Sequence, residues 1–394
     1  MAITDKKTGV WGLDQVYNKE NQGSIWEYVG AQQLTTWGRN EKGQLALNTG
    51  PGDQGSRSSP VQVGSLETWK SISYGIATRS DGTLWTWGDS GWGQMGTNES
   101  HPGPSWVRSS PVQVPGTTWS TELGSVFRAQ SQAMAVKTDG SLWMWGANNT
   151  GDLGQNNKTA RSSPVQVPGS TWGSGYQQSM IAVTGNIKTD GTLWVWGNNS
   201  YGDLGQGDNT NYSSPVQVPG TTWRTVSSAY NAVIATKTDG TLWCWGNNEV
   251  GQLGLSNRTD KNSPNQVPGT TWKNGTAGYG YCLATKTDGT LWAWGGQSNG
   301  QLGLNQTYGT PSNRKDRSSP VQVPGTTWDK PIQQMHTGGS GAFKTDGTLW
   351  LWGDNEYGQV GDNNLVRKSS PVQVPGDWKV IAKDQRSTTG IRVL

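Results

Sequence analysis

Hydrophobic and polar positions follow one pattern along most of this chain, and the clearest copy starts at Lys237. There Lys-Thr-Asp-Gly precedes the run Thr-Leu-Trp-Cys-Trp-Gly. An Asp-Gly pair between two strand-like runs predicts a tight hairpin, because a type I′ turn needs positive φ at both central residues. Alternation along the second run places Trp243 and Trp245 on one face and Leu242 and Cys244 on the other. Both faces are bulky and apolar, so we expect this strand to be covered on both sides.

The rest of the copy predicts three more short strands. Residues 251–254 read Gly-Gln-Leu-Gly, with glycines where a backbone must turn or pack closely. A polar loop leads to residues 263–269, where a strand beginning Ser-Pro ends in a Pro-Gly turn. Trp272 and a small-residue strand at 281–285 complete the unit. Four short strands per copy is the number in a propeller blade.

The same unit occurs seven times in order, which predicts a repeat architecture before any local motif is considered. The tryptophans that open the glycine-rich turns are Trp37, Trp87, Trp145, Trp196, Trp245, Trp294 and Trp352. The Asp-Gly hairpins begin at Asp81, Asp139, Asp190, Asp239, Asp288 and Asp346. We therefore predict an all-β fold, a seven-bladed β-propeller of four-stranded blades spanning residues 33–394, with a short N-terminal extension at residues 1–32.

The two ends of the repeat array are complementary. The first repeat starts at 33–38 with no hairpin before it, and the chain ends at 389–394 with no hairpin after it. We expect Ile391–Leu394 to pair with Leu34–Trp37 in a single blade. That pairing closes the ring and removes two exposed strand edges.

The order of motifs also resembles a known family. Trp-x-Trp-Gly, Asn-x-x-Gly-Gln-Leu-Gly, Pro-x-x-Val and Ala-x-x-x-Asp-Gly are similar to the regulator of chromosome condensation repeat over about residues 34–394. The resemblance implies a seven-bladed propeller. A chromosome-binding member of that family is a guanine nucleotide exchange factor with a basic N-terminal tail, whereas this tail is apolar and nearly neutral. Nucleotide exchange on a small GTPase is therefore kept as the alternative function.

Residues 1–32 do not follow the repeat. The stretch Gly-Val-Trp-Gly-Leu-Asp-Gln-Val-Tyr-Asn-Lys at 9–19 resembles the N-terminal lead of structural proteins of tailed phages. The resemblance implies a virion protein, made in the host cytoplasm, that attaches to other virion structural proteins within an oligomeric assembly. A second possibility is that this apolar segment packs on its own propeller. The residues expected to make the attachment are Val10, Trp11, Leu13, Val16, Tyr17, Ile25, Trp26 and Tyr28.

Charge and composition narrow the classes of partner. The formal net charge is +3, and Lys and Arg form no run beyond short pairs. That distribution argues against nucleic-acid binding. The N-terminus lacks the apolar core of a signal peptide, and no stretch has the length of a transmembrane span, so we expect no membrane insertion. We expect the two cysteines, Cys244 and Cys282, to be small buried apolar residues and not a disulfide.

No arrangement of residues predicts catalysis. The two histidines, His101 and His336, lie in different repeats and outside any Ser-His-Asp or Cys-His pattern. Asp203, Asp208 and Asn209 lack the dense alternation of oxygen ligands of a calcium loop, so we expect turns and solvated loops there. We predict a protein that is not an enzyme and that binds neither cofactor nor metal.

Recognition is expected on long loops of the rigid ring. The loop that follows the glycine-rich turn is longer in repeats one, two and six. Repeat three has a different insertion, 122–128, whose Phe127 is expected to pack on the N-terminal segment or on a partner. We predict a propeller module for adhesion or decoration of a virion that binds a host surface glycan or protein. The candidate loop residues are His101, Trp106, Arg108, Tyr308, Arg314 and Lys315.

Overall fold

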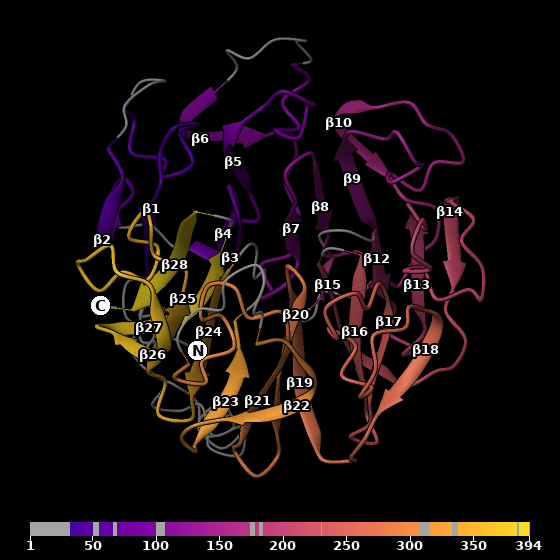
Figure 1. Ribbon diagram of the computed structural model, residues 1–394. Helices are drawn as coiled ribbons and strands as arrows, with labels where there is room; N and C mark the ends of the chain where they lie inside the picture. The colour runs from indigo at the N-terminus through magenta and orange to yellow at the C-terminus, as the bar shows by residue number, and fades with distance from the viewer. Residues whose placement is uncertain are drawn as a thin grey trace, which may run out of the picture.

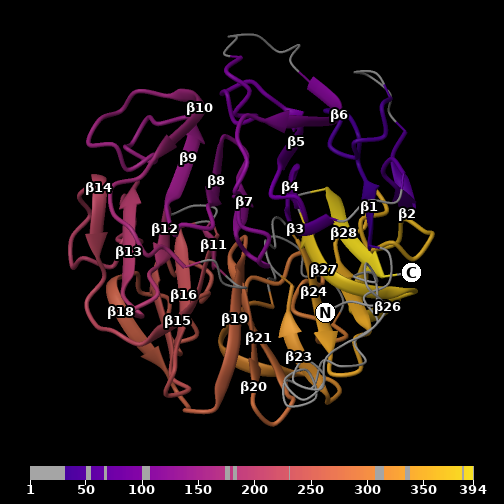
Figure 2. The same ribbon diagram turned by 180° about the vertical axis from the view of Figure 1, so that it is seen from behind.

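The computed structural model describes residues 32–49, 55–65, 69–99, 107–173, 178–180, 184–229, 231–306, 315–332, 338–383 and 386–393. Within these ranges the chain forms strands and no helix. The sheets follow one another around a closed ring, which the colour sequence shows from both sides (Figures 1 and 2). The predicted all-β seven-bladed propeller is confirmed.

The strands are grouped into blades in chain order. Blade 1 contains β27 (Asp377–Lys383), β28 (Ser387–Val393), β1 (Gln32–Gly38) and β2 (Arg57–Gln62); blade 2 contains β3 (Trp69–Ser73), β4 (Ile76–Arg79), β5 (Leu84–Asp89) and β6 (Val107–Val114); and blade 3 contains β7 (Val126–Arg128), β8 (Gln132–Val136), β9 (Leu142–Gly146) and β10 (Arg161–Gln166). Blade 4 contains β12 (Thr184–Ile187), β13 (Leu193–Gly197) and β14 (Tyr212–Gln217); blade 5 contains β15 (Trp223–Ala229), β16 (Ala232–Lys237), β17 (Leu242–Gly246) and β18 (Lys261–Val267); blade 6 contains β19 (Trp272–Gly278), β20 (Tyr281–Lys286), β21 (Leu291–Gly295) and β22 (Arg317–Val323); and blade 7 contains β23 (Trp328–Pro331), β24 (Gly339–Lys344), β25 (Leu349–Gly353) and β26 (Lys368–Val374).

Blade 4 departs from the four-stranded pattern in the described part of the chain. Its sheet has three strands, and the position of the missing first strand holds an isolated bridge between Trp172 and Lys188. The short strand β11 (Gln178–Met180) pairs in parallel with β15 of blade 5 instead. The other blades pair their consecutive strands antiparallel, as the hairpins predict.

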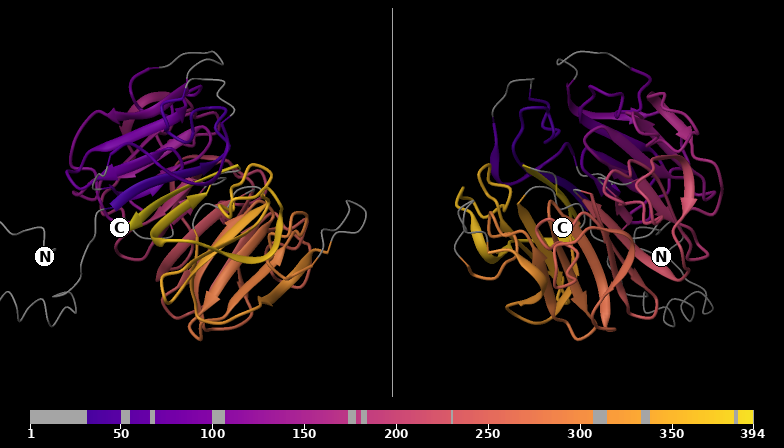
Figure 3. Two further views of the ribbon diagram at one scale, coloured as in Figure 1. Left: turned by 90° about the vertical axis from the view of Figure 1, so that its left-hand side faces the viewer. Right: turned by 45° about the vertical axis from the view of Figure 1, so that its right-hand side comes forward.

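The ring closes as the sequence predicts. β28, from the end of the chain, pairs antiparallel with β1 along its whole length, with Leu34 opposite Ile391 and Trp37 opposite Thr388. The side view in Figure 3 shows the indigo start of the chain beside the yellow end. Blade 1 is therefore built from both ends of the described chain, and neither β1 nor β28 has an unpaired edge.

Each Asp-Gly hairpin has the same small hydrogen-bond network. In blade 5, Asp239 Oδ1 accepts from the backbone amide and the hydroxyl of Thr241, at 2.9 and 2.6 Å, and Trp243 Nε1 donates to Thr241 Oγ1 at 2.9 Å. The hydrogen bonds from Thr241 lower the pKa of the Asp239 carboxyl. Lys237 Nζ lies 4.6 Å from the ring centroids of both Trp223 and Trp243, where a cation is attracted to the faces of the rings. Trp243 is half-buried and not covered on both sides, because this layer ends at the surface.

The tryptophan that precedes the glycine-rich turn of each repeat joins its blade to the preceding one. Its indole Nε1 donates to a backbone carbonyl in the glycine-rich turn of the previous repeat, at 2.9–3.1 Å. The last such bond, from Trp37 to Gln359, spans the closure. The final glycine of the turn lies against the ring: a Cβ on Gly254, whose φ is +70°, would be 2.8 Å from Trp294 Nε1. This contact explains why the turn ends in glycine next to a buried tryptophan.

The insertion in repeat three forms part of the ring. It supplies β7, the first strand of blade 3, and Phe127 packs with Met134, Met144 and Trp172 in a buried cluster. Phe127, which was expected to pack on the N-terminal segment or on a partner, is buried in the core of the propeller itself. Cys244 and Cys282 are buried, as expected, and form no disulfide.

Candidate functional site

The propeller has two unlike faces. One carries the Asp-Gly hairpins, and we call it the hairpin face; the other carries the glycine-rich turns and the loops between the first and second strands of the blades, and we call it the turn face. In each glycine-rich turn a hydrogen bond from the backbone amide holds the residue that precedes the first glycine. In the first two turns, the amide of Lys42 donates to Gln44 Oε1 and the amide of Trp92 donates to Gln94 Oε1, both at 2.7 Å. The scaffold therefore fixes the backbone and leaves the side chain at this position free to differ among repeats.

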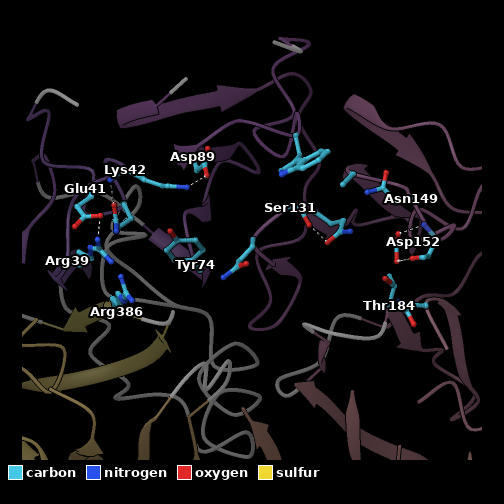
Figure 4. A pocket seen from close by; sticks show the side chains of 17 residues that line it. Arg39, Glu41, Lys42, Tyr74, Asp89, Ser131, Asn149, Asp152, Thr184 and Arg386 are labelled. Carbon is cyan, nitrogen blue, oxygen red and sulfur yellow. Dashed lines mark hydrogen bonds and ion pairs between the residues drawn. The ribbon is translucent and has the colours of Figure 1, made fainter. Parts of the chain in front are cut away.

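A polar pocket of about 840 Å³ opens on the turn face over blades 1 to 4 (Figure 4). Its volume lies within the range of about 300–1,000 Å³ typical of small-ligand sites. The residues that line it are Arg39, Glu41, Lys42, Gln44, Tyr74, Asp89, Trp92, Gln130, Ser131, Gln132, Ala147, Asn149, Thr150, Asp152, Thr184, Asn198 and Arg386. We take this pocket as the candidate functional site, because variable side chains of four blades converge there on a rigid frame.

One wall of the pocket is charged. Arg39 and Arg386 flank the ring of Tyr357, with their guanidinium carbons 4.8 and 5.2 Å from its centroid. Arg39 forms an ion pair with Glu41, and Lys42 Nζ lies 2.8 Å from Asp89 Oδ2. Figure 4 shows these charged side chains together on one side of the pocket.

Asp89 is ionised at neutral pH. Burial acts to raise the pKa of its carboxyl, but hydrogen bonds from Lys42 and the amide of Gly91, together with the charges of Lys42 and Arg128, hold the pKa below its ordinary value. The Lys42–Asp89 pair therefore joins blades 1 and 2 at the rim of the pocket.

The opposite wall is largely uncharged. Asn149, Asp152 and Thr184 lie together there, at the ends of blades 3 and 4 (Figure 4). Asp152 accepts hydrogen bonds from the amide and the hydroxyl of Thr150, at 3.1 and 2.7 Å. Trp92 also lines the pocket, and it is 56% exposed, whereas the other described tryptophans are buried or half-buried.

The burial of three ionisable residues was not predicted from the sequence. Arg128 and Lys383 occupy the innermost strands of blades 3 and 1, and Asp203 occupies the glycine-rich turn of blade 4. A comparison of the repeats could have revealed them. Asp203 occupies a position where most repeats have Gln. Arg128 and Lys383 occupy a position where blades 5 and 6 have the small residues Ser228 and Ala277.

Asp203 corrects the expectation of a solvated turn. The residue is fully buried, and its Oδ2 has no hydrogen-bond partner in the described part of the chain. Burial raises the pKa of its carboxyl to about 7. Asp208, by contrast, is only half-buried and accepts from the amide of Thr210 at 2.9 Å, as a turn residue should. The described residues contain no cluster of three or more His, Cys, Asp or Glu side chains that could hold a metal ion.

Most of the predicted site residues cannot be placed. All eight attachment residues, and also His101, Trp106, Tyr308 and Arg314, lie outside the described residues. Arg108 lies in β6 and forms an ion pair of 2.6 Å with Glu99. Lys315 precedes β22 in blade 6 and is half-buried. Arg108 and Lys315 thus lie on separate blades and neither lines the pocket.

Comparison with known proteins agrees with this architecture. The model of the regulator of chromosome condensation (RCC1) repeat matches residues 33–76, 139–178, 190–235, 239–284, 288–343 and 346–382. The chain belongs to the RCC1 repeat family. A related RCC1 repeat model also matches residues 224–252.

The curated relatives of this RCC1-repeat chain are similar to only part of it, and the match covers only part of each relative. The ultraviolet-B receptor UVR8 of Arabidopsis thaliana is 27% identical over 229 residues, which cover 52% of this chain and 48% of the receptor. The E3 ubiquitin-protein ligase HERC2 of Mus musculus is 27% identical over 195 residues, 45% of this chain and 4% of the ligase. The chain therefore spans about half the length of the first relative and a small part of the second.

Solved structures show the same fold at low sequence identity. The structure of Kap60 bound to yeast RCC1 (Prp20) matches with a TM-score of 0.76 and 17% identity, covering 95% of this chain and 92% of that one. Human WBSCR16 matches with a TM-score of 0.73 and 19% identity, covering 92% of this chain and 100% of that one. In the described residues, no helix has the length and apolar character needed to cross a membrane.

Proposed function

We propose that this RCC1-repeat propeller is a non-enzymatic binding module that presents its turn face to a ligand. The observation that carries the proposal is the pocket over blades 1 to 4. A nearly uniform ring of repeats holds there a set of side chains that differ from copy to copy, among them Lys42, Trp92 and Thr150 at one repeat position. Variation confined to one face of a rigid scaffold is typical of a recognition surface.

We further propose that the module belongs to a tailed-phage virion and is anchored through residues 1–32. The support is the resemblance of residues 9–19 to phage structural proteins and the apolar side chains that this segment contains, such as Trp11 and Trp26. The propeller would then serve adhesion or decoration, at the tail or on the capsid, with the turn face directed outward.

Immunolabelling of purified virions tests the anchoring. An antibody against the chain should label particles seen in negative stain, and a phage carrying Trp11→Ala and Trp26→Ala should lose the label. A phage carrying Trp92→Ala is the matched control, because it changes an exposed tryptophan of the turn face and should keep the label. Unlabelled wild-type particles would contradict the virion assignment.

The alternative function is nucleotide exchange on a small GTPase. Membership of the RCC1 repeat family favours it, and one solved structure of a similar fold, Prp20p of Saccharomyces cerevisiae, is described with its binding to Gsp1p and histones. This function predicts that the purified chain accelerates release of a fluorescent guanine nucleotide from a small GTPase of its cell. If a stoichiometric amount of the chain does not change the release rate, the result argues against nucleotide exchange and favours the binding module.

A further inference from the structure

We infer that the turn-face pocket binds an acidic oligosaccharide, a glycan that bears a carboxylate. The inference rests on the proposed binding function and names the ligand class for that site. Three features of the pocket point to this class: an exposed indole, a pair of guanidinium groups, and a wall of hydrogen-bonding side chains that are neutral except for Asp152.

The exposed indole supplies a stacking surface. Trp92 is 56% exposed. The indole-to-carbonyl bonds between neighbouring blades on either side of it are made by Trp87 and Trp145, so Trp92 is an additional tryptophan. Its backbone is nevertheless fixed, because its amide donates to Gln94 Oε1 at 2.7 Å. A large aromatic side chain that is exposed on the lining of a polar pocket offers one flat apolar face to a ligand that is otherwise polar. The C–H face of a sugar ring has this mixed character.

The guanidinium pair supplies an anion-binding element. Arg39 and Arg386 both contact the ring of Tyr357, and these cation–π contacts hold the two guanidinium groups next to the pocket. Glu41 neutralises Arg39, and Asp89 pairs with Lys42, so the wall with three cations and two carboxylates retains one net positive charge. A planar guanidinium binds a carboxylate through two parallel hydrogen bonds.

The opposite wall matches sugar hydroxyls. Asn149, Thr184 and Asn198 provide neutral donors and acceptors, and Asp152, oriented by Thr150, provides an acceptor. The same carboxylate disfavours a polyphosphate chain that would run across both walls. An extended peptide would need apolar subsites, and the lining offers few besides Trp92.

A glycan microarray probed with the full-length chain tests the inference. The array pairs each uronate- or sialate-bearing oligosaccharide with its carboxyl-reduced, neutral counterpart. We expect at least tenfold stronger binding to one or more acidic members than to their reduced partners. Arg386→Gln should abolish this difference while leaving binding to the neutral partner, and Trp92→Ala should weaken both.

The matched control is Tyr201→Ala, which removes an exposed aromatic side chain at the same repeat position but outside the pocket. It should bind like the wild-type chain, and circular dichroism should show all three variants folded. Equal binding to acidic and reduced partners, binding unaffected by Arg386→Gln and Trp92→Ala, or no binding to any acidic member each overturns the inference. Virion labelling is read out independently, so these results leave the proposed anchoring intact.

Discussion

Two junctions between blades contain a buried cation at the same position of the repeat, but the two cations differ in their hydrogen bonds. Arg128 is opposite Ala133 in blade 3, and Lys383 is opposite Thr388 in blade 1; both partners in turn face the buried tryptophan of their blade. Arg128 donates to three backbone carbonyls of blade 2, those of Gly75, Trp87 and Asp89. Lys383 Nζ has no hydrogen-bond partner in the described part of the chain.

The difference follows from the shape of the two cations. A guanidinium carries five N–H donors in a rigid plane and can reach several carbonyls at once, whereas an ammonium is a compact, strongly hydrated charge. Lys383 therefore loses hydration without regaining its hydrogen bonds, and burial lowers its pKa to about 8 despite the opposing charge of Asp354. We therefore expect the buried cation to stabilise the junction at blade 3 and to weaken the junction at blade 1.

The largest expected effect is at the junction that closes the ring. Deleting residues 390–394 removes the part of β28 that pairs with both β1 and β27. We expect a loss comparable to the whole stability of a domain, about 5–15 kcal/mol, with the chain expanded or aggregated at 25 °C. Thermal unfolding followed by tryptophan fluorescence measures it, and an unchanged melting temperature would show that closure contributes little.

Replacing Arg128 should have the next largest effect. Arg128→Met removes the guanidinium donor from three carbonyls of blade 2, of which only that of Gly75 is also bonded by the amide of Trp87, so we expect the free energy of unfolding to fall by about 3–5 kcal/mol. Lys383→Met is the matched control and should be neutral or stabilising at pH 7, because it removes a buried charge that has no hydrogen-bond partner among the described residues. Urea unfolding of both variants gives the two values. A larger loss for Lys383→Met than for Arg128→Met reverses the ranking of the two junctions.

The stability contributed by Lys383 should depend on pH. Its pKa in the folded state, about 8, lies below the ordinary value of 10.5, so between these two pH values the unfolded chain binds more protons. Stability of the wild-type chain therefore rises through this window, and the cost of burying the charge is fully present below pH 8. The advantage of Lys383→Met over the wild type should shrink by an amount on the order of 3 kcal/mol between pH 7 and pH 10.5. A pH-independent difference would mean that Lys383 keeps an ordinary pKa.

The smallest expected effect concerns a similar contrast between two carboxylates. Asp152 is hydrogen-bonded by Thr150, whereas Asp203 has one unpartnered oxygen and a pKa raised to about 7. Between pH 3.8 and 7 the carboxyl of Asp203 binds its proton more tightly in the folded than in the unfolded chain. The free-energy cost of burying the charged carboxylate is therefore absent at low pH and complete above pH 7. Asp203→Gln, which restores the residue found in most repeats, should stabilise the chain by about 1–3 kcal/mol at pH 8 and by less at pH 5.

Asp152→Gln is the control for this substitution. It loses the hydrogen bond from the Thr150 hydroxyl to a carboxylate and should give no gain at either pH. Differential scanning calorimetry at the two pH values compares the variants. A gain that is the same for both substitutions would show that glutamine is simply the better turn residue.

The sequence was sufficient to predict the fold because each local signal recurs. The Asp-Gly hairpins, the strand with two tryptophans and the glycine-rich turn each have a local physical cause, and the complementary ends predict closure. The three-stranded sheet of blade 4 was not predicted, because β11 pairs with a strand of the next repeat. Such pairing depends on packing between blades and leaves no mark on the hairpin pattern.

The candidate site was less accessible to sequence reasoning. Long loops were expected to carry recognition, yet the pocket is lined mainly by single positions next to the repeat motif, such as Arg39, Asp89 and Asn198. These positions look unremarkable in any one copy and converge only when the ring is assembled. Trp92 was the available signal, since it adds an aromatic residue to the turn beyond the tryptophans of the repeat.

The shared closing blade has a consequence for how such a ring can change its length. Blade 1 takes two strands from each end of the described chain, so the period of the gene is offset from the boundary of a blade. A duplication or deletion of one full period therefore adds or removes one complete four-stranded sheet, whichever residue it starts from. The indole-to-carbonyl bond between neighbours is restored at the new join in the same step. Unequal recombination between near-identical repeats can thus alter the number of blades without first opening the ring.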